Sequence, residues 1–380
     1  MGEPVVTIYN GPLSWYERKL RGVKRESFFM RLMQDEEDRR NTTMTIRGGG
    51  YDDPPSLPER PRPGHLEMLS SDFTSVSDHV IQNFGTHIHR IRPTRISLHN
   101  PPQQVALEVT RRFNATVKTF TYPDIPADAL QTINEQFNAR VVGQRRVKRQ
   151  LLSVLHELTR PERTKPLVLM FFGPSGVGKT ETARFLNEQV GGTLLRKQFS
   201  MFHSEKFANY LFGGSHSEGS FARDLLDREP GVVLIDEFDK ANEFFFSAFF
   251  ELFDEGVFED KNYRVQVGPA IIICTSNYAS TAEVEAAVGD ALASRFDAMI
   301  EFAPLSGEHL TSIAKRLLRD RHAALREDER ALVDLATATD HLAKVIKADG
   351  NVRRLGKQVD ELVSRMVVDK KYPEPPHPAL

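Results

Sequence analysis

GPSGVGKT, at residues 173–180, matches the pattern G-x-x-x-x-G-K-[ST] in full. It follows the apolar run PLVLMFF at 166–172 and precedes ETARFLNEQV at 181–190, whose spacing is helical. In this strand, loop and helix context, the glycines let backbone N–H groups converge on phosphate oxygens, and the helix N-terminus adds positive potential. The stretch therefore predicts a nucleotide site in an α/β domain.

The roles within this loop follow from the chemistry of phosphate and magnesium. Lys179 is expected to neutralise the β- and γ-phosphates, and Thr180 is expected to place its hydroxyl on Mg²⁺. ATP and Mg²⁺ are the expected cofactors. The predicted cofactor-binding residues are Gly173, Pro174, Ser175, Gly176, Val177, Gly178, Lys179, Thr180, Glu181 and Asp236.

Two further apolar runs end in polar residues that suit the same site. GVVLIDEFDK, at 231–240, supplies Asp236 as the expected Mg²⁺ partner beside Thr180, and Glu237 as the group that orients and activates the attacking water. In such folds, ligands bind at the edge of the sheet where these strands end. Asn277, in CTSNY, is expected at this edge, where it either contacts the γ-phosphate and water or caps a turn.

Five short apolar runs lie between residues 165 and 304, with helical spacing between them. They are PLVLMFF, TLLRKQF, GVVLID, AIIICTS and AMIEF. Runs of this kind are typical of parallel strands that are buried on both faces. They predict a doubly wound domain with a parallel five-stranded sheet. Apolar residues spaced by three and four between 332 and 366 predict a small helical domain after it.

Residues 1–125 have a less regular pattern, and we expect an α+β module of unknown fold that chooses a substrate or partner. Short runs favour β-structure or alternate as strands do. These runs are VVTIY at 5–9, TTMTI at 42–46, VALEV at 105–109 and ATVKTFTY at 115–122. The proline-dense stretch at 52–64 is typical of a loop or linker. YPDIP then breaks the pattern and predicts a domain boundary near Pro126.

Composition limits the classes of function. The chain has 380 residues, 40% of them hydrophobic and 27% charged, which is typical of a soluble globular protein. Its formal net charge of -2 gives no general reason to expect nucleic acid. The single cysteine, Cys274, allows no disulfide within the chain, so we expect a reducing, cytoplasmic location. No run of 18 apolar residues occurs, and membrane insertion is not expected.

Beyond the phosphate loop, a series of motifs resembles the AAA+ ATPase family, most closely the Clp-type unfoldases and the second ring of ClpA and ClpB. VVGQRRVKRQLL resembles the family's lead-in helix, GPSGVGKTE its Walker A motif and VVLIDEFDKA its Walker B motif. FELFDEGVFEDKNYRVQVGPAIIICTSN resembles its helix, hairpin and sensor-1 strand in unbroken order. The resemblance covers about residues 135 to 370.

The resemblance implies roles for three further residues. Asn277 takes the place of sensor 1, Arg295 in ALASRFD that of the arginine finger, and Arg353 in GNVRRLGKQV that of the sensor-2 arginine. The guanidinium keeps its proton and, supplied by a neighbouring subunit, stabilises the charge on a transferring phosphoryl group. Such a finger implies a nucleotide-dependent homo-oligomer, either a ring or a helix. A surface arginine is the alternative at both arginine positions. The predicted catalytic residues are Glu237, Asn277, Arg295 and Arg353.

The resemblance also implies a division of the chain. Residues 126–305 are expected to form the large AAA+ ATPase domain, and 306–370 the helical lid domain. Residues 1–125 form the N-terminal module, and 371–380 are a proline-rich tail.

Three functions are compatible with these features. An ATP-hydrolysing oligomer that remodels or unfolds a protein is favoured by the Clp-type resemblance. An ATP-switched assembly that recruits or regulates a partner enzyme without threading is the first alternative, and a nucleic-acid-associated ATPase is the second. Basic residues between 140 and 149 suit phosphate backbones. They lack interleaved aromatic residues and lie opposite an apolar face, so nucleic acid ranks last.

A second glycine-rich run, GGSHSEGS at 213–220, bears on the first two functions. It lacks the lysine and the helical stretch of a phosphate loop. Clp-type motors carry an aromatic residue in this region that grips the translocating chain, whereas here Tyr210, Phe212 and Phe221 only flank the run. We expect a mobile loop at the centre of the assembly, where His216 and Glu218 contact a polar substrate; a surface loop without this role is the alternative.

Overall fold

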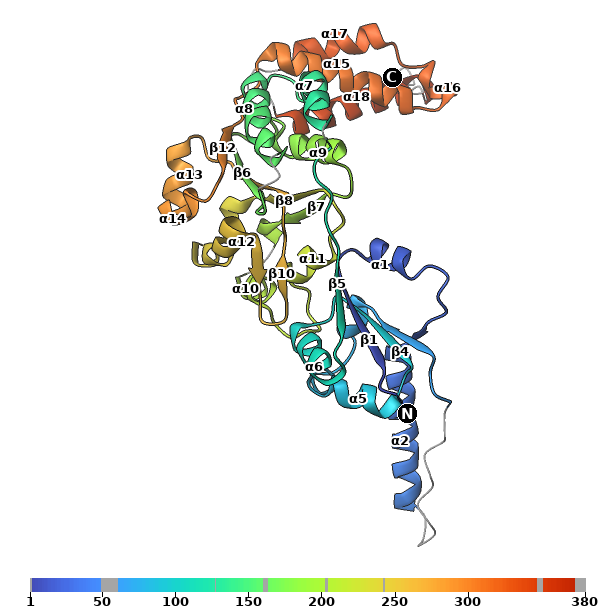
Figure 1. Ribbon diagram of the computed structural model, residues 1–380. Helices are drawn as coiled ribbons and strands as arrows, with labels where there is room; N and C mark the ends of the chain where they lie inside the picture. The colour runs from blue at the N-terminus through green and yellow to red at the C-terminus, as the bar shows by residue number, and fades with distance from the viewer. Residues whose placement is uncertain are drawn as a thin grey trace.

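The computed structural model describes residues 2–48, 61–126, 128–159, 163–201, 204–241, 243–346 and 351–372. Figure 1 shows an elongated molecule with an N-terminal module at one end, a central α/β domain, and helices at the other end. Most of the proline-dense stretch at 52–64 and the tail from residue 373 lie outside the described residues. Within the described part of the chain, no helix is both long and apolar enough to cross a membrane.

The central sheet contains each of the five predicted strands. They are β6 (Leu167–Phe172), β7 (Leu195–Gln198), β8 (Val232–Asp236), β11 (Ile271–Thr275) and β12 (Ala298–Glu301). Their order is β12-β6-β11-β8-β7, and every pair is parallel. Strands β6, β8 and β11 are buried along their whole length, as their continuous apolar runs predict.

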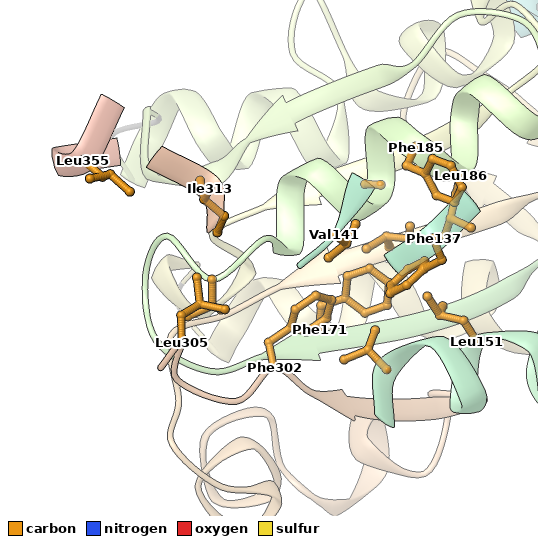
Figure 2. Packing of buried hydrophobic residues seen from close by; sticks show 14 of the residues in the cluster. Phe137, Val141, Leu151, Phe171, Phe185, Leu186, Phe302, Leu305, Ile313 and Leu355 are labelled. Atoms are coloured by element: carbon orange, nitrogen blue, oxygen red, sulfur yellow. The ribbon is translucent and has the colours of Figure 1, made fainter. Parts of the chain in front are cut away.

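Alternate residues of β6 enter two separate cores, one on each face of the sheet. Leu169 and Phe171 belong to one core, while Val168 and Met170 belong to the other. Figure 2 shows the first core, where the Phe171 and Phe302 rings lie 5.1 Å apart between centroids.

The helices of the central domain and its flanks are α7 (Ala129–Arg140), α8 (Arg145–Leu155), α9 (Lys179–Val190), α10 (Ser204–Phe212), α11 (Phe221–Asp227), α12 (Phe250–Glu255), α13 (Thr281–Val288) and α14 (Asp290–Ala293).

Shorter elements complete this domain. The hairpin of β9 (Val257–Glu259) and β10 (Arg264–Gln266) is antiparallel. The 3-10 helices are His156–Thr159, Phe199–Met201, Phe238–Lys240 and Glu243–Phe249. The C-terminal helices are α15 (Gly307–Ala324), α16 (Glu327–Arg330), α17 (Leu335–Val345) and α18 (Val352–Lys371). Helix α15 packs against α17 and α18, which agrees with the predicted helical domain.

The N-terminal module is built around a second five-stranded sheet. Its strands are β1 (Val5–Asn10), β2 (Glu26–Ser27), β3 (His65–Met68), β4 (Arg95–His99) and β5 (Thr116–Thr119). Their order is β2-β3-β4-β1-β5, and all pairs are parallel. Because helices alternate with parallel strands, the module is α/β, and the prediction of an α+β module is wrong.

Two of the predicted N-terminal strands are helices. The module's helices are α1 (Leu13–Lys19), α2 (Phe28–Gly48), α3 (Ser70–Phe73), α4 (Asp78–Gln82), α5 (Phe84–Ile91) and α6 (Gln103–Phe113). The backbone of α2 includes TTMTI, and α6 includes VALEV. Val105 and Val109 are four residues apart and both buried, so the apparent alternation in VALEV is also the spacing of one helix face. The other two runs are in β1 and β5.

Candidate functional site

The phosphate loop connects the end of β6 to the start of α9, as the motif predicts. Gly173, Gly176 and Gly178 have φ values of 130°, 79° and 111°, which side chains disfavour. A Cβ at Gly173 would lie 2.2 Å from the carbonyl oxygen of Phe302, and one at Gly176 would lie 2.1 Å from Oδ1 of Asn351. Both the backbone conformation and the surrounding space therefore require glycine at these two positions.

Lys179 is buried at the start of α9, and its ammonium is fully engaged. Nζ donates to the carbonyl oxygens of Gly173 at 2.5 Å and Pro174 at 2.8 Å, and to Oδ1 of Asn277 at 3.3 Å. Burial lowers the pKa of Lys179 to about 8, because desolvation outweighs the attraction of nearby carboxylates. Asn277 is thus beside the phosphate loop, which agrees with its predicted place at the carboxyl edge of the sheet.

The two carboxylates at the end of β8 are held by residues of the neighbouring strands. Oδ1 of Asp236 accepts from Oγ1 of Thr275 at 2.5 Å, and Oδ2 accepts from Nη2 of Arg196 at 2.5 Å. The backbone of Glu237 is left-handed, with φ of 58°, and its N–H donates to Oγ1 of Thr275 at 3.0 Å. Nε2 of Gln198 donates to Oε2 of Glu237 at 3.2 Å. Strands β7 and β11 therefore fix both carboxylates at one edge.

A cleft of about 590 Å³ brings these groups together. Of the predicted residues, those that line it are Ser175, Gly176, Val177, Gly178, Lys179, Thr180, Glu181, Asp236, Glu237, Asn277 and Arg353. Gly173 and Pro174 are not among the lining residues, but their carbonyls accept from Lys179. Val141, Val142, Leu305 and Ile313 add apolar side chains, the kind of wall that a planar base requires.

Several lining residues were not predicted from the sequence. They are Arg140, Val141, Val142, Arg184, Arg196, Gln198, Thr275, Leu305, Ile313, Arg316 and Val352. The signal for Arg196 and Gln198 is that they alternate within a predicted strand, so both face one side. Gln144, in the lead-in motif, is buried and donates to the carbonyl oxygens of Val177 at 3.3 Å and Ala303 at 2.8 Å. It therefore connects the phosphate loop to the segment after β12.

Arg353 and Asn351 bring the last helix of the lid to the cleft. Oδ1 of Asn351 accepts from the backbone N–H of Arg353 at 2.8 Å and caps α18. Its Nδ2 donates to Oγ of Ser175 at 3.4 Å. Arg353 lines the cleft, which is the position that a sensor-2 arginine requires. Its role stays a prediction.

Arg295 lies away from the cleft of its own chain, just after α14. Its Nε donates to Oδ2 of Asp254 at 2.7 Å, and its guanidinium carbon lies 4.5 Å from the centroid of the Phe250 ring. The side chain is 27% exposed. A finger that acts on another subunit has to be separate from its own site, so this position is compatible with the predicted role.

The run at 213–220 packs against the N-terminal module. His216 is buried; its Nε2 lies 2.9 Å from the carbonyl oxygen of Val76, and its Nδ1 lies 2.7 Å from Oδ1 of Asp78. Glu218 is exposed. The expectation that His216 faces a substrate is therefore wrong for this arrangement, because α4 and the residues before it cover the ring. None of the residues 213–220 lines the nucleotide cleft.

Comparisons with known proteins agree with this geometry. Residues 165–321 match the family model described as AAA domain (Cdc48 subfamily). Chaperone protein ClpB of Clostridium tetani is 28% identical over 252 residues, which cover 57% of this chain and 29% of the relative. The ClpA homolog protein of Fuscovulum blasticum is 29% identical over 229 residues, with coverage of 52% and 29%. The chain thus spans about three-tenths of the length of these two relatives.

Two further comparisons concern another Clp protein and a solved structure. The ATP-dependent Clp protease ATP-binding subunit ClpE of Bacillus subtilis is 25% identical over 276 residues, which cover 63% of this chain and 39% of the relative. A structure of Hsp104 in its closed state, with ATPγS and FITC casein, aligns with a TM-score of 0.55 and 16% identity, over 80% of this chain and 61% of that one. The latter likeness concerns the fold. Residues 165–321 thus match an AAA domain, and the predicted resemblance to Clp-type AAA+ ATPases is confirmed. The predicted doubly wound fold of the central domain is confirmed as well, whereas the α+β prediction holds for no described part of residues 1–125.

Proposed function

We propose that this chain hydrolyses ATP with Mg²⁺, within a nucleotide-dependent homo-oligomer that remodels or unfolds a protein. The observation that carries the proposal is the cleft itself. It combines a complete phosphate loop, the two carboxylates Asp236 and Glu237, the amide of Asn277, and an apolar wall. Catalysis of phosphoryl transfer depends mainly on such positioning and on charge stabilisation.

The oxygen atoms at the cleft suit a magnesium ion. Thr180 and Asp236 would hold it, because Mg²⁺ prefers a few protein oxygen ligands together with substrate phosphates. When bound, Mg²⁺ neutralises charge on the phosphate oxygens. In the described arrangement, Asp236 accepts hydrogen bonds from Thr275 and Arg196, so the metal competes with Arg196 for this carboxylate.

The remaining residues have separate tasks in hydrolysis. Glu237 accepts a proton from the attacking water, while the new bond forms at the γ-phosphorus and the bond to the bridging oxygen breaks. Gln198 and Thr275 orient Glu237 through its carboxylate and backbone N–H. Lys179 and Asn277 contact the γ-phosphate of the bound ATP. Arg295 of another copy completes the site, and Arg353 senses the nucleotide from the lid.

Glu237→Gln tests the assignment of the base. The variant keeps the phosphate and metal contacts, so it should bind ATP with unchanged affinity, hydrolyse it hardly at all, and retain an ATP-bound assembly. ATP turnover and size-exclusion chromatography with ATP measure both properties. Hydrolysis at the wild-type rate would show that another group activates the water.

The substrate class needs its own experiment. The relatives named above include a chaperone and an ATP-binding subunit of a protease, and the Hsp104 structure contains casein, which favours a protein substrate. ATP turnover should therefore rise with an unfolded protein and stay at the basal rate with DNA. Stimulation by DNA alone would instead favour a nucleic-acid-associated ATPase.

A cytoplasmic location stays a prediction from the single buried cysteine.

An ATP-switched assembly that recruits a partner without threading is the second candidate. The specific observation in its favour is that His216 is buried against the N-terminal module and that residues 213–220 contain no aromatic side chain. Ser217→Tyr separates the two functions, because it adds an aromatic ring at an exposed position of this loop. Remodelling of an unfolded protein should improve for a threading motor and stay unchanged for a switch.

A further inference from the structure

The carboxyl edge of the N-terminal sheet is bonded to the end of α11 in the ATPase domain. Nδ2 of Asn100 donates to Oδ1 of Asp227 at 2.5 Å, and Oγ of Ser70 donates to Oδ2 of Asp227 at 2.9 Å. Asn100 is itself fully buried and exchanges hydrogen bonds of 2.8 and 2.9 Å with the backbone of Gly11. Asp227 is therefore anchored to the rigid part of the module.

The position of this contact within the module is informative. Asn100 follows β4 and Gly11 follows β1, and these two strands are neighbours although the chain forms two others between them. Such a point, where the strand order reverses, is where parallel α/β sheets bind ligands. In this chain, the carboxylate of Asp227, from the ATPase domain, occupies this point of the N-terminal sheet. The module therefore binds the end of α11 as it would bind an acidic ligand.

Helix α11 is connected in turn to the edge strand β7. Asp224, three residues before Asp227, forms an ion pair with Nζ of Lys197 at 2.6 Å and accepts from the hydroxyl of Tyr210 at 2.5 Å. Lys197 is in the middle of β7, which is the last strand of the central sheet and pairs with β8. A shift of α11 therefore acts on this strand through one partly buried ion pair.

The opposite face of β7 holds the two carboxylates of the nucleotide site. Successive side chains of a strand point to opposite faces, so Arg196 and Gln198 lie opposite Lys197. Arg196 bonds Asp236, and Gln198 bonds Glu237. A continuous series of contacts thus runs from the N-terminal module to the carboxylates that the reaction uses.

We propose that Lys197 and Asp224 are positioning residues through which the docked N-terminal module keeps Arg196 on Asp236 and so restrains the ATPase. The inference rests on the proposed ATP hydrolysis. The mechanism requires two states of the chain, because coupling between distant sites depends on such a pair of arrangements. In the first state the module is docked and Arg196 bonds Asp236. In the second state α11 is released from the module and Mg²⁺ has displaced Arg196 from Asp236. A protein that engages the carboxyl edge of the module in place of Asp227 activates turnover.

The test uses the full chain with Lys197→Met and Asp227→Asn, and measures ATP turnover against Mg²⁺ concentration at saturating ATP. Both substitutions loosen β7, so the Mg²⁺ concentration for half-maximal turnover should fall and kcat should rise, each by about fivefold, the low end of usual coupling factors. The KM for ATP should stay unchanged. A residue with a merely structural role would lower activity without moving the Mg²⁺ dependence.

Two further variants test the connection itself. The double variant Lys197→Met with Asp227→Asn should shift the Mg²⁺ dependence no further than either single change, because residues of one series act non-additively. Exchanging the charges, with Lys197→Asp and Asp224→Lys together, should restore the wild-type dependence. Glu17→Gln is the matched control, since it breaks the 2.8 Å pair with Arg25 within the module and leaves Asp227 bonded.

The outcomes separate this inference from the proposed function. If the wild-type chain hydrolyses ATP and the variants keep its Mg²⁺ dependence, or their effects add, the inference is wrong and the proposed function stands. If the wild-type chain lacks ATPase activity, amide hydrogen exchange at residues 195–198 is decisive: faster exchange in Asp227→Asn supports the connection, and unchanged exchange overturns it.

Discussion

The central sheet and the N-terminal sheet each have five parallel strands, yet their carboxyl edges differ. In the central sheet, Asp236 is the last residue of β8 and Asn277 lies two residues after the neighbouring strand β11, and both line an open cleft. In the N-terminal sheet, Gly11 and Asn100 occupy the corresponding edge and bond each other, and Asn100 also donates to Asp227. One edge presents polar groups to a ligand, and the other is filled by the same chain.

The difference shows what a nucleotide site needs beyond polar residues at a sheet edge. The central edge has a glycine loop whose backbone leads into α9, a helix of 12 residues, so its first N–H groups are directed at the cleft. The N-terminal edge has the four-residue α3 and the buried Asn100, whose amide is satisfied by protein groups. The first edge is built for phosphate, and the second is an interface.

The largest effect should come from Arg295→Ala, which tests whether the central edge is completed by another copy. The variant should bind ATP normally and lose about 10³-fold in turnover, because the guanidinium stabilises charge on the transferring phosphoryl group. Steady-state turnover and ATP binding measure the two quantities. Wild-type turnover would mean that Arg295 only holds Asp254 on the surface.

Mixing Arg295→Ala with Lys179→Ala sharpens this test. In a mixed oligomer, some interfaces place a subunit that keeps Lys179 in its cleft next to a subunit that keeps Arg295. These interfaces form complete sites, so part of the ATPase activity should return. Native mass spectrometry confirms that mixed oligomers form. Absence of recovery at every mixing ratio, with mixed oligomers present, would contradict a finger supplied by a neighbour.

The stability of the N-terminal module should be sensitive to an added negative charge at the carboxyl edge of its sheet. The variant Asn100→Asp tests this. The change places a carboxylate against Asp227 and against the carbonyl of Gly11, and should lower the free energy of unfolding of the module by about 1–3 kcal/mol. Urea unfolding followed by the fluorescence of Trp15, which is the single tryptophan of the chain and lies in the module, measures it. Asn114→Asp is the matched control, because Asn114 is also left-handed, with φ of 48°, and is exposed. Equal effects of the two changes would mean that the interface is weak.

The central edge should depend on pH through Lys179. Burial lowers the pKa of this ammonium to about 8, and ATP binds its charged form, so affinity should fall as pH rises through that value. Between pH 7 and 9 the loss should be about tenfold, as measured with a fluorescent ATP analogue. Lys179→Arg should remove this dependence, since a guanidinium keeps its proton. A flat profile for the wild type would show that the ammonium stays charged throughout.

The smallest effect should come from His216→Ala, at the contact between the second glycine-rich run and the module. Loss of its bonds to the Val76 carbonyl and Asp78 should lower the free energy of unfolding by about 1 kcal/mol. ATP affinity should not change, because this run lies outside the cleft. Glu218→Ala is the exposed control and should have no effect on either quantity. Weaker ATP binding by folded His216→Ala would assign the loop to the nucleotide site.

Sequence patterns predicted the central sheet better than the N-terminal one. Continuous apolar runs such as AIIICTS exclude an amphipathic helix, and each became a strand. VALEV carries two signals at once, because Val105 and Val109 satisfy both alternation and a four-residue helical spacing. TTMTI favours strands by residue type, but its backbone lies within the 21-residue helix α2, because β-propensity is a weak and context-dependent preference. The domain boundaries and the roles of Arg295 and Arg353 stay predictions.

The sequence by itself determined the phosphate loop, the five apolar strands and the carboxylates that follow one of them. Each of these depends on contiguous residues, because backbone N–H groups that share a phosphate have to be neighbours in the chain. Only the tertiary structure decided that Arg196 bonds Asp236, that Asp227 fills the edge of the other sheet, and that His216 is buried. These pairs are tens to more than a hundred residues apart, and local spacing does not specify which strand or module lies beside which.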